Sequence, residues 1–293
     1  MNILITGATG QVGRAVTQHL QRLSNHEHIY YAVRKPALTR EELPAKSWQI
    51  RQFDFEDTFS FEAALENIDH LFLLRPPSLT DVDGKVVPLL KAAKKTGLKR
   101  IVYLSIQGVD SNKWTPHYKI EQAIKRSGIP YIMLRPGFFM QNLVGPMLED
   151  IRDRDRIFVP AGKNRFNFVD VDEVGEVAAR ELLRPQIEQD THTLVAGSPV
   201  DFYRVARMLS EVLGRKVKYR NPSLVYFALH KLWKGEAAIF VFVMIMLYRF
   251  TTIPAEERYT HRLQRLLQRP PKLLSTYIEE NASAFQPEAG KQK

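Results

Sequence analysis

The chain of 293 residues contains no cysteine. Disulfide bonds, thiolate metal ligands and a cysteine nucleophile are therefore excluded. The first residues also lack a basic segment followed by a cleavable apolar stretch, and instead enter an apolar run at once. We therefore expect no secretory leader and a cytoplasmic location.

Long apolar runs are scarce as well. One uninterrupted run, 237–247, lies between Glu236 and Arg249. It is too short to cross a bilayer, because a spanning helix needs about 20 apolar residues. We expect no transmembrane segment and interpret the run as a helix buried in the core or in a dimer interface. A wall of a pocket for a lipophilic substrate is the alternative.

Acidic residues are outnumbered by basic ones, 32 to 42, which gives a net charge of +10. Such a balance can indicate binding to nucleic acid or to an anionic membrane. The cations are spread along the chain and no nucleic-acid-binding motif is present, so direct nucleic-acid binding is not expected. The histidines have no metal-ligand spacing, and the acids of 150–156 alternate with arginines, so no metal site is predicted either.

The most informative positive feature is the opening of the chain. An apolar run at 3–5 is followed by three glycines and then by apolar residues at helical spacing. A strand, a glycine-rich turn and a helix in this order form a dinucleotide-binding fingerprint, in which the helix N-terminus offers free N–H groups to a pyrophosphate. The predicted contacts are Gly7, Thr9, Gly10, Gln11, Val12 and Gly13. The alternative is a glycine-rich turn without a ligand.

The end of the second predicted strand has no acidic residue. Sites that prefer NAD(H) place an Asp or Glu there to bind the ribose 2′-hydroxyl. Arg34 and Lys35 stand in that place instead. Two cations attract a 2′-phosphate, which an arginine binds with its forked guanidinium. We therefore predict NADP(H) in preference to NAD(H), with ordinary solvated cations as the alternative.

Strand-like and helical patterns alternate through the first two-thirds of the chain. This alternation predicts an α/β fold with a Rossmann-type, doubly wound parallel sheet and a smaller, mostly helical C-terminal lobe. We place the dinucleotide-binding core at 1–140, with 166–197 returning to it, and the substrate-side lobe at 141–293. The predicted strands are 3–5, 29–33, 50–53, 70–74, 100–104 and 131–134, and the predicted helices are 12–23, 59–66, 80–95 and 116–126.

Several stretches resemble the NmrA-like branch of the atypical short-chain dehydrogenases/reductases. They are 6–13, 100–105, 127–142, 168–174 and the Arg-Pro-Pro at 269–271. The resemblance implies either an NAD(P)H-dependent quinone reductase or a cofactor-binding redox sensor without turnover. It also implies that Asp54 and Phe55 flank the adenine, and that Leu74, Arg75 and Ser105 lie along the ribose and nicotinamide. Pro136, Gly137 and Phe138 would close over the nicotinamide end. A turn for Asp54 and core packing for Phe55 and Leu74 are the alternatives.

The usual catalytic pair of this superfamily is missing. Most short-chain dehydrogenases use a Tyr and a Lys four residues later, the lysine lowering the tyrosine pKa. Counted back from Gly128, these places hold Lys113 and His117. His117 is our candidate catalytic residue, because an unperturbed histidine titrates near neutrality and could protonate a quinone oxygen or bind the nicotinamide ribose. A helix-start histidine without a role is the alternative.

We predict from these residues an NADP(H)-binding oxidoreductase that transfers hydride to a quinone or another small electrophile. The acceptor pocket would include Phe138, Phe139 and Met140. A non-catalytic redox sensor acting through a protein partner is the second hypothesis. A sugar-nucleotide epimerase ranks low, because it depends on the missing tyrosine. The sequence leaves open whether the chain forms a homodimer.

Overall fold

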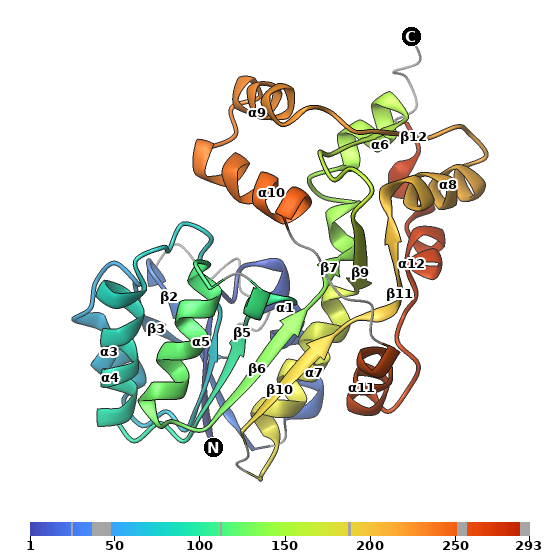
Figure 1. The fold of residues 1–293 in the computed structure, drawn as a ribbon. Helices are drawn as coiled ribbons and strands as arrows, with labels where there is room; N and C mark the ends of the chain where they lie inside the picture. The colour runs from blue at the N-terminus through green and yellow to red at the C-terminus, as the bar shows by residue number, and fades with distance from the viewer. Residues whose placement is uncertain (25, 37–47, 112, 187–188, 251–256, 288–293) are drawn as a thin grey trace. The chain divides into compact units, whose positions relative to one another are not determined.

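The structure is a computed structural model that describes residues 1–24, 26–36, 48–111, 113–186, 189–250 and 257–287 (Figure 1). The chain forms two compact units. Unit 1 comprises Met1–Pro136, Val171–Leu194 and Arg262–Arg269, and unit 2 comprises Gly137–Asp170, Val195–His261 and Pro270–Lys293. The first segment of unit 1 thus ends before the predicted boundary at 140, and unit 1 also includes Arg262–Arg269, which the sequence prediction assigned to the substrate-side lobe.

A seven-stranded parallel sheet forms the centre of unit 1, in the order β10-β6-β5-β4-β1-β2-β3. This confirms the predicted doubly wound fold. The residues of β1, β4 and β5 are almost all buried, as expected for strands covered on both faces. The strands are β1 (Asn2–Thr6), β2 (His28–Val33), β3 (Gln49–Gln52), β4 (His70–Leu73), β5 (Arg100–Leu104), β6 (Tyr131–Pro136) and β10 (Asp190–Leu194).

Helices cover both faces of this sheet, with α3, α4 and α5 on one face and α1 and α7 on the other (Figure 1). Helix α1 approaches α7 closely, because a Cβ on Gly175 would lie 2.5 Å from the Cβ of Ala15. Helix α5 begins at Thr115, whose side chain accepts the Tyr118 N–H, and ends at Gly128 with φ of 75°. The helices are α1 (Gln11–Leu23), α3 (Ser60–Leu65), α4 (Val87–Lys95), α5 (Pro116–Ser127) and α7 (Val171–Leu183).

The predicted helix at 80–95 is wrong in its first part. The structure has a π-helical turn, η2 (Val82–Val86), before α4. Asp81 caps this turn, and its carboxylate accepts the Gly84 N–H at 2.8 Å. The Asp81 side chain thus satisfies one of the free amides at the start of this turn.

Unit 2 has two small sheets and several helices. One sheet has the order β11-β9-β7, and the other pairs β12 with β8. Its strands are β7 (Phe138–Phe139), β8 (Arg156–Phe158), β9 (Arg165–Val169), β11 (Ala196–Asp201) and β12 (Lys218–Arg220). Its helices include α6 (Leu148–Arg154), α8 (Phe202–Leu213), α9 (Leu224–Trp233), α10 (Ala238–Phe250) and α12 (Leu274–Glu280), and α11 (Glu257–Leu267) begins in this unit and ends in unit 1.

The interpretation of 237–247 as a helix buried in the core is wrong, and its burial in a dimer interface stays a prediction. The run forms most of α10, and among the residues 238–249 only Val241, Met244 and Tyr248 are buried. Ile239, Phe240, Phe242 and Leu247 are exposed. No helix among the described residues combines the length and apolar character needed to cross a membrane.

Candidate functional site

The carboxyl ends of the central strands place the predicted cofactor residues along one edge of the sheet. The order β5-β4-β1-β2 places four residues next to one another, each directly after its strand: Ser105, Leu74, Gly7 and Arg34. The parallel register aligns Thr6 with Ala32, so the glycine turn lies next to the residues that follow β2. Ligands of doubly wound sheets bind at this edge.

The glycine turn has the close packing that the fingerprint requires. Gly7 has φ of 66°, and a Cβ there would lie 2.8 Å from the Cδ2 of Leu74. A Cβ on Gly13 would lie 2.1 Å from the carbonyl oxygen of Gly7, so α1 can start this close to the turn only with glycine. The Gly10 N–H donates to the Gly7 carbonyl at 3.0 Å, which closes the turn.

The start of α1 fits a phosphate group. Gly10 is the N-cap, no side chain in the described chain caps this helix, and its first turn has no acidic residue. The first amides of a helix have no partner within the helix, and the helix dipole adds positive potential there. Gln11, Val12 and Gly13 therefore present N–H groups where the fingerprint places the pyrophosphate.

Arg34 and Lys35 are both exposed and follow β2 directly. Residues 34–36, the described residues after β2, include no acid that could bind a ribose 2′-hydroxyl. The position and exposure of the two cations fit a 2′-phosphate at the adenosine end of the sheet edge.

Asp54 and Phe55 follow β3 and have structural roles. The Asp54 carboxylate accepts the Glu56 N–H at 3.0 Å, and its own N–H donates to the Ser60 hydroxyl. Phe55 is buried and meets Phe53 edge to face at 4.9 Å. Contact of either residue with an adenine stays a prediction.

A three-residue network stands behind the β4 and β5 ends. Arg75 donates through Nη2 to the Nε2 of His117 at 3.0 Å, and the His117 Nδ1 lies 3.0 Å from the hydroxyl of Tyr103. A guanidinium can only donate, so Nε2 must be the unprotonated nitrogen. His117 is therefore the neutral Nδ1–H tautomer and donates to Tyr103. Arg75 is itself held by the carbonyls of 76, 77 and 79 at 2.9–3.0 Å.

This network changes the chemical role that His117 can have. Burial, with the neighbouring Arg75 charge as a second cause, lowers the pKa of His117 to about 3. The sequence reasoning assumed an ordinary pKa and a free ring, and the structure corrects both. At neutral pH the imidazole is uncharged and both nitrogens are engaged, so it is not a ready proton donor.

Ser105 remains as an unsatisfied polar group at the same edge. Its hydroxyl oxygen is buried and has no hydrogen-bond partner among the described residues. An orphaned buried hydroxyl costs free energy unless a ligand or water satisfies it. Its position after β5 fits a hydrogen bond to the nicotinamide or ribose of a dinucleotide.

The sequence reasoning missed two elements of the site. Tyr103 was not singled out, although strand alternation puts it on the same face of β5 as Ser105. The second element is the bidentate pair between Arg135 and the fully buried Glu121, at 2.9 and 2.6 Å. Glu121 lies four residues after His117 on α5, so this pair fixes the helix that carries the histidine.

The predicted acceptor residues belong to β6 and unit 2. Pro136 ends β6, and Gly137 packs so tightly that a Cβ would lie 2.5 Å from the Asn167 carbonyl. Phe138 is partly buried and packs on an aromatic cluster, with ring centroids 5.3–5.9 Å from those of Phe166, Phe168, Phe202 and Tyr248. Met140 is completely buried in the core, so the prediction that it lines an open pocket is wrong.

Comparison with known proteins identifies the family. The family model described as the NmrA-like family matches residues 1–229. The chain belongs to the NmrA-like family. The NmrA-like chain is 29% identical to the uncharacterized oxidoreductase YesF of Bacillus subtilis, over 96% of this chain and 95% of that protein. It is 27% identical to quinone oxidoreductase 2 of Escherichia coli, over 77% and 79% of the two chains.

Solved structures confirm the Rossmann-type architecture of this NmrA-like protein. Triphenylmethane reductase of Citrobacter sp., solved in complex with NADP(H), superposes with a TM-score of 0.83. The alignment covers 96% of this chain and 99% of that one, at 24% sequence identity. At this identity the similarity concerns the fold.

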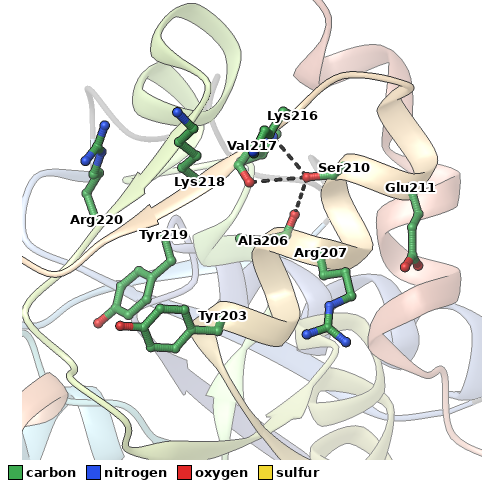
Figure 2. Close-up of a pocket in the computed structure, with 10 residues that line it drawn as sticks. All are labelled: Tyr203, Ala206, Arg207, Ser210, Glu211, Lys216, Val217, Lys218, Tyr219 and Arg220. Atoms are coloured by element: carbon green, nitrogen blue, oxygen red, sulfur yellow. Dashed lines mark hydrogen bonds between the residues drawn. The ribbon is translucent and has the colours of Figure 1, made fainter.

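A separate hollow of about 590 Å³ lies within unit 2, between α8 and β12 (Figure 2). Its walls carry Arg207, Lys216, Lys218 and Arg220 beside the rings of Tyr203 and Tyr219. None of the predicted cofactor residues lines it.

Proposed function

We propose that this NmrA-like protein is an NADP(H)-dependent oxidoreductase that transfers hydride to a quinone or another small electrophilic acceptor. The observation that supports it is the order of groups along the sheet edge. Cations follow β2, free helix amides and a tight glycine turn follow β1, and an unsatisfied serine hydroxyl follows β5. This order matches the 2′-phosphate, the pyrophosphate and the nicotinamide end of one extended dinucleotide.

The protein's residues position the reactants in this proposal. The reduced cofactor, when bound, supplies the hydride. The α1 amides bind the pyrophosphate, Arg34 and Lys35 bind the 2′-phosphate, and Ser105 orients the nicotinamide end. Arg75 and Tyr103 hold the His117 ring in one tautomer and one orientation. Because His117 is not a ready acid, the proton that accompanies the hydride comes from solvent.

The name of the relative quinone oxidoreductase 2 supports a quinone acceptor. A quinone also suits the chemistry, since its reduction needs hydride delivery and positioning more than a dedicated tyrosine acid. The absence of a Tyr–Lys pair at Lys113 and His117 disfavours ordinary alcohol oxidation.

A fluorescence titration with NADPH and NADH tests the cofactor, and a quinone panel in the same cuvette tests turnover. Arg34→Ser removes a charge-assisted contact of roughly 1.5–3 kcal/mol, so we expect the NADPH Kd to rise at least about tenfold. The NADH Kd should stay within about twofold, because NADH has no 2′-phosphate. Arg22→Ser is the matched control, since Arg22 is an exposed cation in the last turn of α1, away from the sheet edge. Equal affinity of the wild type for NADH and NADPH would refute the NADP(H) preference.

A redox sensor is the second candidate, and the state of His117 favours it. A neutral imidazole with both nitrogens engaged leaves this site without an evident acid. Tight NADPH binding without consumption by any quinone would support the sensor and reject the reductase. Multiple turnovers would do the reverse.

A further inference from the structure

The outward face of α9 is apolar. Val225, Tyr226, Leu229, Leu232 and Trp233 are 70, 57, 61, 43 and 85% exposed. Their spacing of three, four and seven residues places them on one stripe of the helix. Phe227 and Lys231 are buried on the other side. A surface helix normally shows the opposite arrangement, with its polar face toward water.

Helix α10 packs against α9 and extends this surface. Ile239, Phe240, Phe242 and Leu247 are exposed, whereas the inward residues pack in the core of unit 2. We call the nine exposed side chains of the two helices the α9–α10 apolar surface. Scattered single apolar residues are normal on soluble proteins, but a contiguous group of this kind indicates an interaction site.

Positive charge borders this surface. Between Lys216 and Arg249 the sequence has one acidic residue, Glu236, against six lysines and arginines, of which Lys231 is buried and Lys234 pairs with Glu149. Strand β12, with Lys218 and Arg220, leads through three residues into α9 (Figure 1). Figure 2 shows these two side chains on the wall of the α8–β12 hollow, with Lys216 above it and Arg207 across it. Within the described part of the chain, these four cations form no ion pair.

We propose that the α9–α10 apolar surface docks unit 2 onto an anionic membrane surface. The aromatic and aliphatic side chains enter the boundary between headgroups and acyl chains, and the cations of β12 and α8 meet lipid phosphates. The helices lie in the plane of the interface and do not cross it. With 13 residues, α10 is roughly 20 Å long, which is shorter than the hydrocarbon core of about 30 Å.

The charge pattern favours a membrane over a second copy of the chain. A symmetric dimer would place the same patch on both sides of the interface. The unpaired cations that border it would then face each other without counter-ions, in a protein that already carries a charge of +10. An anionic lipid surface neutralises the same cations. Docking of this kind does not depend on the cofactor site.

Vesicle sedimentation with the full-length protein tests the proposal. We compare vesicles of phosphatidylcholine alone with vesicles that also contain phosphatidylserine. We expect binding to the mixed vesicles, with affinity that falls as salt is added and is at least about tenfold weaker on pure phosphatidylcholine. The fluorescence of Trp233 should shift to the blue on binding, and Trp233→Phe should remove that shift.

Variants separate the two parts of the surface. Leu229→Ser with Trp233→Ser should weaken binding at least about tenfold, and Lys218→Ser with Arg220→Ser should remove most of the dependence on phosphatidylserine. Phe59→Ser is the matched control, because Phe59 is 94% exposed in unit 1, outside the surface. All variants should keep the wild-type melting temperature and NADPH affinity, since the substituted side chains are exposed.

Three results would overturn membrane docking. The first is a wild type that binds neither kind of vesicle. The second is a Leu229→Ser, Trp233→Ser variant that binds as well as the wild type. The third is light scattering that shows a dimer which this double variant dissociates, without vesicle binding by either protein. That last result would assign the surface to a second copy.

Discussion

The buried pair of Glu121 and Arg135 gives the sharpest prediction about the site. The guanidinium of Arg135, on β6, donates to both oxygens of Glu121 on α5, at 2.9 and 2.6 Å. Glu121 has no exposed surface. Arg135 also donates to Asp110 at 2.6 Å, but that carboxylate is 66% exposed. Arg135 thus pairs with one buried and one exposed carboxylate. The loss of each partner can therefore be compared within a single network.

Glu121→Gln should destabilise the fold substantially. Removing one partner of a buried ion pair costs about 3–5 kcal/mol. Asp110 still neutralises part of the Arg135 charge, so we expect a loss just below that range, about 2–3 kcal/mol. At about 2–4 °C per kcal/mol, the melting temperature should fall by roughly 5–10 °C. Asp110→Asn removes a surface partner and should cost less than about 1 kcal/mol.

Circular dichroism during heating measures both variants, and an NADPH titration below the transition adds a functional readout. Glu121 lies one helical turn after His117, so the Glu121→Gln variant should also bind NADPH more weakly than the Asp110→Asn variant. Equal melting temperatures for the two variants would refute the reasoning. So would a Glu121→Gln melting temperature within about 1 °C of the wild type.

Three further predictions concern the glycine turn and His117. Gly13→Ala should lose both stability and NADPH binding, because its Cβ would lie 2.1 Å from the Gly7 carbonyl oxygen. Gly10→Ala should keep the melting temperature, since the added Cβ would lie 3.4 Å from the same oxygen. It should weaken NADPH binding, because a bound pyrophosphate would contact that Cβ. Unchanged NADPH affinity would count against the phosphate site. The lowered pKa of His117 means that the unfolded chain takes up its proton first, so this residue reduces stability as pH falls from about 6.5 toward about 3. His117→Asn should make the free energy of unfolding depend less steeply on pH in that window and leave its pH dependence unchanged above pH 7. An equally steep dependence in the variant would show that His117 is not neutral in the folded protein.

The sequence alone determined the central sheet and the position of its glycine turn. Apolar runs, and the turn residues that bound them, predicted the ends of five strands to within one or two residues: β1, β2, β4, β5 and β6. The reason is that buried parallel strands are short apolar runs between turn residues, a local signal that the tertiary structure does not override. The glycine turn could be predicted equally well. Its geometry depends on glycines that lie close together in the sequence and have no side chain.

The state of His117 could not be read from the sequence. Its pKa depends on burial behind β5 and on Arg75, which lies in the loop after β4. Arg75 and Tyr103 both contact His117, although they are 42 and 14 positions away from it in the sequence. Tyr103 was missed for the same reason. Hydrophobic spacing indicates which side chains are buried, but not which polar groups meet inside.

The run at 237–247 also shows what the sequence can predict and what only the tertiary packing decides. Its composition determined that it would be an apolar helix, and α10 confirms that. Whether its apolar face would be covered was decided only by how α9 and α10 pack on unit 2. A helix that is apolar on all sides carries no sequence signal for the side that stays exposed, because its period is the same in a core and at an interface.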